Sequence, residues 1–202
     1  MFLKFHRSLD RIKRRFRKDD RGTTAVEFAF VGGPFLFLLL ATFETGLNFL
    51  TEYSLQSATT TASRLIRTGQ AQAGGFTKEQ FKTEFCKHVP SYLDCSSKVY
   101  INVETRTDFT SAAARTDARD ADGNLDEDLE DNTAFQPGNA GEIVIVETFY
   151  VWDLFTPGIG KLLSLNSPSS KPAFLANLGS NKRLITGVAV FQNEPFNDAS
   201  GS

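Results

Sequence analysis

The most constraining feature of this sequence is an uncharged apolar run from Phe28 to Phe43, which Glu27 and Glu44 bound. Extended to the preceding residues, the segment 23–43 has 21 residues and contains one acid. A bilayer core about 30 Å thick requires about 20 residues of helix, and Gly and Pro are more frequent in membrane-spanning helices than in soluble ones. The segment therefore predicts a transmembrane helix, with a buried core helix as the alternative.

Basic residues gather immediately before this segment. Residues 1–22 hold nine basic side chains and three acids, a net charge of +6, although all 202 residues together carry −2. The rest of the chain therefore carries −8. Because positive charges stay cytoplasmic, we expect a single-pass protein with a cytoplasmic N-terminus and residues 44–202 exported. A nucleic-acid arm is the alternative for the basic run, but topology alone explains basic residues beside a span, so we expect no nucleic-acid partner.

A glycine and a carboxylate mark the cytoplasmic end of the span. Residues 21–28 read RGTTAVEF, so a basic leader ends in Gly22 and an acid, Glu27, follows five residues later. Prepilin-type sequences share this arrangement. With the apolar run and the ETG sequence at 44–46, residues 21–46 resemble the TadE-like family of the tight-adherence (Tad, Flp-type) pilus machinery.

The resemblance implies a minor pseudopilin, or pilus-assembly protein, of the bacterial inner membrane, with a periplasmic C-terminal domain. It implies that an aspartyl prepilin peptidase cuts between Gly22 and Thr23, and that membrane lipid and other Tad pilus subunits are partners. The rival hypothesis is an uncleaved, membrane-tethered periplasmic scaffold or binding module of a secretion apparatus. Removal of the leader distinguishes the two.

Glu27 and Phe28 complete the motif, and Glu27 has a physical role available to it. A carboxylate in a hydrophobic span is unfavourable without a partner. A cut after Gly22 would create an α-amine on Thr23, which Glu27 could neutralise on its own chain or on a neighbour, and such pairing favours lateral association. The alternative is an ordinary interfacial or capping acid in the headgroup region.

The helix should continue beyond the membrane from Glu44 to Gln72, and the glycines at 74–75 should end this part. Apolar or small side chains recur there at spacings of three and four, which predicts one packing face. That face comprises Phe43, Leu47, Leu50, Ser54, Ala58, Thr61 and Leu65, and the opposite face carries Glu52, Gln56 and Arg67. Thr77, with Gln80 three residues later, predicts a capped second helix that runs to about Val89.

Three later segments alternate apolar and polar residues or are rich in β-branched residues, which predicts strands over 98–109, 142–152 and 183–192. Helices followed by strands indicate an α+β, pilin-like fold in which the long helix packs against a small antiparallel sheet. We expect four aromatic residues to lie in its core, with a partner-binding patch as the alternative: Phe149, Tyr150, Trp152 and Phe155.

Two cysteines, Cys86 and Cys95, lie nine residues apart in the segment expected outside the cytoplasm. In an oxidising compartment this spacing predicts a disulfide that closes a small loop. A metal site is disfavoured because His88 is the only imidazole nearby.

An acidic insertion, 116–141, separates the first two predicted strands. Four residues in it offer oxygen ligands at alternate positions, as calcium loops do: Asp120, Asp122, Asn124 and Asp126. Leu125 replaces the turn glycine of an EF-hand, and Asp131 would have to serve as the last ligand, so a solvated, mobile loop is the favoured interpretation and Ca²⁺ the alternative.

Nothing in the sequence nominates an active site. His6 lies in the leader and His88 stands alone, and the GIGK sequence at 158–161 lacks the spacing of a phosphate-binding loop. We therefore expect a structural protein without a small-molecule substrate rather than an enzyme.

Overall fold

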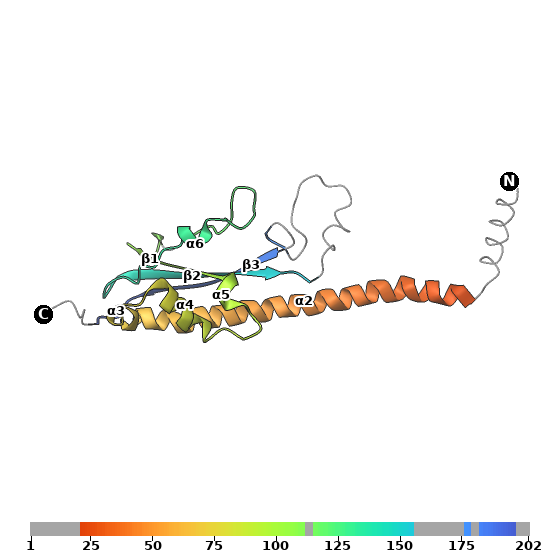
Figure 1. Ribbon diagram of the computed structural model, residues 1–202, viewed down its shortest axis with the longest axis horizontal. Helices are drawn as coiled ribbons and strands as arrows, with labels where there is room; N and C mark the ends of the chain where they lie inside the picture. The colour runs from red at the N-terminus through yellow and green to blue at the C-terminus, as the bar shows by residue number, and fades with distance from the viewer. Residues whose placement is uncertain (1–20, 112–114, 156–175, 179–181, 197–202) are drawn as a thin grey trace. The chain divides into compact units, whose positions relative to one another are not determined.

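The computed structural model describes residues 21–111, 115–155, 176–178 and 182–196. The chain divides into two compact units, Met1–Phe43 and Glu44–Ser202. Helix α2 (Arg21–Arg67) supplies the described part of the first unit and the first helix of the second (Figure 1). The leader residues 1–20, and the GIGK sequence, lie outside the described residues.

Helix α2 contains 47 residues and includes Pro34. It ends at Arg67 rather than at Gln72, because Gly69 adopts a left-handed backbone (φ 77°) that breaks the helix before the short helix α3 (Gln70–Ala73). Two basic residues, Arg64 and Arg67, occupy the last turn, where the negative end of the helix dipole favours them.

Three antiparallel strands form a sheet in the order β1-β2-β3, as expected for the α+β fold. They are β1 (Val99–Arg106), β2 (Ile143–Asp153) and β3 (Lys182–Gln192), each within three residues of its predicted bounds. β2 is the central strand and is the most deeply buried, in line with its richness in β-branched and aromatic residues. The fold class predicted from the sequence is confirmed.

The exported part of α2 packs on one face of this sheet, but through a different set of side chains than expected. The spacing of three and four holds, with the buried positions displaced by about one residue: Glu44, Asn48, Thr51, Leu55, Ala58, Thr59, Ala62, Ser63 and Ile66. Leu50, placed on the packing face by the sequence analysis, is 49% exposed, and Phe43 is exposed as well. Most of the buried side chains on this face are small or polar, and Leu55 and Ile66 are the large apolar ones.

Helix α2 approaches the sheet closely at Gly187 in β3. A Cβ atom on Gly187 would lie 2.5 Å from Thr59 Oγ1 and 2.7 Å from Thr148 Oγ1. The two threonine hydroxyls share a hydrogen bond of 2.7 Å between α2 and β2, both buried, and Thr59 also reaches the carbonyl of Leu55 at 2.8 Å. Only a glycine leaves room for this polar contact.

Part of the opposite face of the sheet is covered by the acidic insertion. Ala118 and Leu129, the latter in the short helix α6 (Leu129–Asn132), pack with Phe149 of β2 in a second, smaller core. Figure 1 shows α6 on the side of the strands away from α2. The insertion was expected to be a solvated loop, but Ala118 and Leu129, with Leu125 packed against them, bind it to the sheet.

Tyr150 and Trp152 lie in the main core with Leu55 of α2, as predicted, and Phe149 is buried on the other face. Phe155 is not in the core: it is 67% exposed, although its ring makes an edge contact with Trp152 at 5.6 Å. It lies beyond the end of β2 at Asp153, so the strand does not place its ring against the core.

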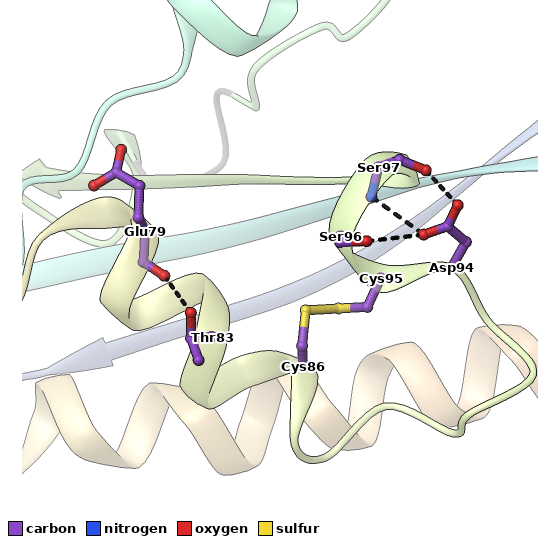
Figure 2. The surroundings of a disulfide bond; sticks show 7 residues. All are labelled: Glu79, Thr83, Cys86, Asp94, Cys95, Ser96 and Ser97. Carbon is purple, nitrogen blue, oxygen red and sulfur yellow. Dashed lines mark hydrogen bonds between the residues drawn. A yellow bond between two sulfur atoms is a disulfide. The ribbon is translucent and has the colours of Figure 1, made fainter.

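A disulfide joins helix α4 (Lys78–Cys86) to the short helix α5 (Cys95–Lys98) (Figure 2). The capping box predicted for α4 is present, with Thr77 and Gln80 exchanging hydrogen bonds. Asp94 caps α5 by accepting from Ser96 and Ser97, and the Ser97 hydrogen bonds lower the pKa of Asp94. The cysteine pairing predicted from the sequence is present in the structure.

Replacing Gly187 should loosen the helix–sheet contact. We expect Gly187→Ala to lower the free energy of unfolding by about 1–3 kcal/mol through overpacking against the two threonines. Denaturant titration of the full chain in detergent, followed by fluorescence of the single tryptophan, Trp152, measures this. Gly46→Ala is the control, since nothing lies within 4 Å of its added Cβ; equal losses in both variants would contradict the close-packing explanation.

Removing the disulfide should destabilise the exported domain. For a loop closed over nine residues, chain entropy gives a loss of about 2–3 kcal/mol, so Cys86→Ser/Cys95→Ser should unfold at lower urea concentration than the wild type. Reductant should shift the wild type to the same midpoint and leave the double variant unchanged. A reductant-insensitive wild type would show that the bond does not contribute to stability.

Candidate functional site

The motif residues lie at the start of α2, the helix that contains the apolar span. α2 begins at Arg21, so the backbone of Gly22 and Thr23 belongs to its first turn. Glu27 lies four residues after Thr23, and residues four apart occupy the same face of a helix, about 6 Å apart along its axis. The predicted pairing of Glu27 with an α-amine on Thr23 is therefore compatible with helical geometry.

Glu27 and Phe28 are both exposed. The Phe28 ring lies over Gly32, where an added Cβ would come within 3.3 Å of Phe28 Cε1, whereas Gly33 has open space around it. Of the two glycines, Gly32 is therefore covered by the Phe28 ring, whereas Gly33 has room for a side chain. Pro34 follows and lacks the backbone N–H that would bond the carbonyl of Phe30, a defect that membrane helices tolerate.

The apolar part of α2 is uncovered. Within the described residues, one helix is long and apolar enough to cross a membrane, and no part of its most apolar stretch is buried. Large side chains such as Phe30, Leu38 and Phe43 are more than half exposed. A surface of this kind requires lipid or another apolar partner.

Exposed apolar side chains continue into the second unit. Phe49, Leu50 and Tyr53 of α2 are about half exposed or more, although they belong to the domain expected outside the membrane. Monomeric soluble domains rarely leave adjacent large apolar side chains uncovered. This side of α2, opposite the sheet, is therefore a candidate contact surface that the predicted packing face had assigned partly to the core.

Glu44 has a structural role that the sequence analysis did not assign. Its side chain is buried, and its Oε1 accepts a hydrogen bond from the backbone N–H of Phe155, just beyond β2. The Glu44 carbonyl also accepts from the Asn48 side chain at 3.1 Å. The acid that bounds the apolar run thus connects α2 to the end of the central strand.

The proposed calcium ligands participate in the turns of their own loop. Asp120 Oδ1 accepts from the backbone N–H groups of Asp122 (3.0 Å) and Asn124 (2.7 Å), and Gly123 between them adopts φ 80°. Asp126 accepts from Asp128 and from Asn132 of α6. Among the described residues, no three His, Cys, Asp or Glu side chains are grouped as metal ligands. Calcium binding stays a prediction.

Among the described residues, the structure places no histidine in a candidate catalytic or metal site. His88 is exposed in the turn after α4, and His6 lies outside the described residues. The site of interest is therefore the helix itself: its motif, its uncovered span and its exposed exported side.

Comparison with known proteins bears on this helix. A family model described as TadE-like protein matches residues 22–64, from the motif glycine to the last turns of α2. No curated protein and no solved structure matches the chain significantly. The resemblance noted in the sequence is thus confirmed over α2, and residues 22–64 match the TadE-like family, whose members are structural proteins associated with the Tad pilus.

Proposed function

We propose that this chain is a minor pseudopilin of the Tad (Flp-type) pilus, anchored in the bacterial inner membrane through residues 23–43. The observation that carries the proposal is the position of the RGTTAVEF motif in the first turns of a helix that matches the TadE-like family and has an uncovered apolar surface. The chain's function is then structural: it supports assembly of an adhesion pilus.

The proposed topology follows from charge. The basic leader, residues 1–22, stays in the cytoplasm, and the acidic exported domain, residues 44–202, lies in the periplasm. A disulfide between Cys86 and Cys95 supports this orientation, because such bonds persist in the periplasm and are rare in the cytosol.

Processing by a prepilin peptidase requires the bond after Gly22 to become accessible. A protease acts on extended backbone, and glycine weakens a helix by about 1 kcal/mol relative to alanine. Gly22 lies in the first turn of α2, where helices fray most readily. The cut would leave Thr23 as the new N-terminus of the apolar helix.

Assembly would then use two features of α2. Glu27 would neutralise the α-amine of Thr23 within the membrane, on the same chain or on a neighbouring subunit. Phe49, Leu50 and Tyr53 would extend the lateral contact beyond the membrane, because they are exposed on the side of α2 that the sheet leaves uncovered.

Substitution of Gly22 should block processing. In cells with active peptidase, intact-mass spectrometry of the membrane-extracted wild type should show a chain that begins at Thr23, and Gly22→Val should retain the leader almost completely. Gly33→Val is the matched control: it places the same side chain at a glycine with open space in the span, and processing should be normal. A wild-type chain that keeps residues 1–22 would favour the tethered-scaffold hypothesis instead.

Substitution of Glu27 should separate processing from assembly. Glu27→Gln should be cut at the normal position, yet its recovery with sheared pili or cross-linked pilus subunits should fall about tenfold or more, because the α-amine then lacks a partner in lipid. Glu52→Gln, at an exposed acid of the same helix in the second unit, should assemble normally. Normal assembly of Glu27→Gln would refute the charge-pairing mechanism and leave the pseudopilin assignment intact.

A further inference from the structure

The two edges of the sheet are closed in different ways. At the β1 edge, the chain covers itself: the Val103 N–H donates to the Ala134 carbonyl at 2.9 Å, and the Gln136 N–H donates to the Val103 carbonyl at 2.8 Å. A backbone segment thus occupies the place of a fourth strand. At the β3 edge, side chains instead form hydrogen bonds with the outward backbone groups.

Gln56 of α2 occupies the middle of the β3 edge. Its Nε2 donates to the Val188 carbonyl at 2.9 Å, and its Oε1 accepts from the Val188 N–H at 3.0 Å. A carboxamide carries one donor and one acceptor in the arrangement of a peptide group. Gln56 therefore pairs with Val188 as a residue of an adjacent strand would.

Asn177 makes the same pair of hydrogen bonds with Leu184, which lies four residues before Val188 in β3. Its Nδ2 donates to the Leu184 carbonyl at 2.9 Å, and its Oδ1 accepts from the Leu184 N–H at 2.6 Å. Beside it, the Leu178 N–H donates to the Lys182 carbonyl at 3.1 Å. Two amide side chains from distant parts of the sequence thus make the same two-point contact with one strand edge.

The spacing of these contacts determines what else can bind. Backbone groups of an edge strand point outward at every second residue, so in β3 the even-numbered residues face away from β2, as Leu184 and Val188 demonstrate. With Lys182, Leu184 and Val188 engaged, the longest stretch of β3 whose outward backbone groups make no such contact with another described residue is Val190 to Gln192. Strands in proteins average about five to six residues, so this stretch is too short for a stable added strand.

We propose that the β3 edge is a strand-pairing surface held closed by two amide clamps, Gln56 and Asn177, and that their removal allows β3 of a second copy of this chain to pair with it. Every copy presents the same edge, and unprotected edge strands are the usual route to sheet-to-sheet association. The clamps restrict contact between exported domains to other surfaces. This inference does not depend on the pilus assignment.

The clamps can be tested by amide exchange. In the full chain in detergent, Gln56→Ala should speed hydrogen exchange of the Val188 amide by about tenfold, as expected for the loss of one backbone-type hydrogen bond. The Ala189 amide faces β2 and should exchange at an unchanged rate. Gln70→Ala is the matched control, because the Gln70 side chain bonds only to Thr68 Oγ1 among the described contacts. An unchanged rate at Val188 would overturn the proposal.

Association provides the second test. Native mass spectrometry in detergent should show that Gln56→Ala/Asn177→Ala forms more dimer than the wild type, whereas Gln70→Ala does not. Adding Val190→Lys, which places a charge on the partly exposed edge residue next to Val188 in the outward set, should return the dimer fraction to the wild-type value. Contacts through the span are common to all variants and cancel in the comparison. A double variant with the wild-type dimer fraction, or a dimer that Val190→Lys leaves intact, would refute strand pairing at β3.

Discussion

The contact at Gly187 determines how the exported domain is built. Because the residue has no Cβ, α2 comes close enough to the sheet for Thr59 and Thr148 to bond across the interface. On the sheet-facing side of α2, small and polar residues such as Ala58, Ala62 and Ser63 are buried together with two larger ones, Leu55 and Ile66. Thr59 donates a hydrogen bond to the Leu55 carbonyl, which limits the free-energy cost of burying its hydroxyl, whereas Thr51 Oγ1 and Ser63 Oγ have no hydrogen-bond partner among the described residues.

The same constraint turns the large apolar side chains of α2 outward. A soluble domain would place Phe49, Leu50 and Tyr53 in its core, but the interface is already filled and they remain exposed. Their exposure stabilises nothing in an isolated chain. It becomes favourable only against lipid or another subunit, which is why this side of the helix supports a role in assembly.

The local elements could be predicted from the sequence because short-range chemistry specifies them. The capping box of α4 needs only Thr77 and Gln80, and the disulfide needs only two cysteines at a loop-closing distance. The packing phase of α2 could not be predicted in the same way. Sequence reasoning places large apolar residues inside, and that rule fails for a helix that leaves Phe49, Leu50 and Tyr53 exposed and buries small and polar residues against the sheet.

The contacts between residues distant in the sequence could not be predicted for a different reason. Gln56 is 132 residues from Val188 in the sequence, and an exposed glutamine on a helix carries no local sign that it will pair with a strand edge. Ala118 and Leu129 likewise lie in an insertion whose acids suggested solvent exposure or calcium binding rather than a core. In both cases the deciding information is the position of the sheet, which no periodicity in α2 or in the insertion encodes.

Because the faces and edges of the sheet are largely covered, the surface left for contact with other molecules lies mainly on α2. α2 covers one face of the sheet, and the insertion with α6 covers part of the other. The segment 134–136 and the two amides close the edges at β1 and β3. Among the described residues, exposed large apolar side chains then concentrate on α2, with scattered exceptions at Tyr92, Phe109, Phe155 and Val190. A domain with protected edges and an uncovered helix is suited to assembling side by side through that helix while its sheets stay separate.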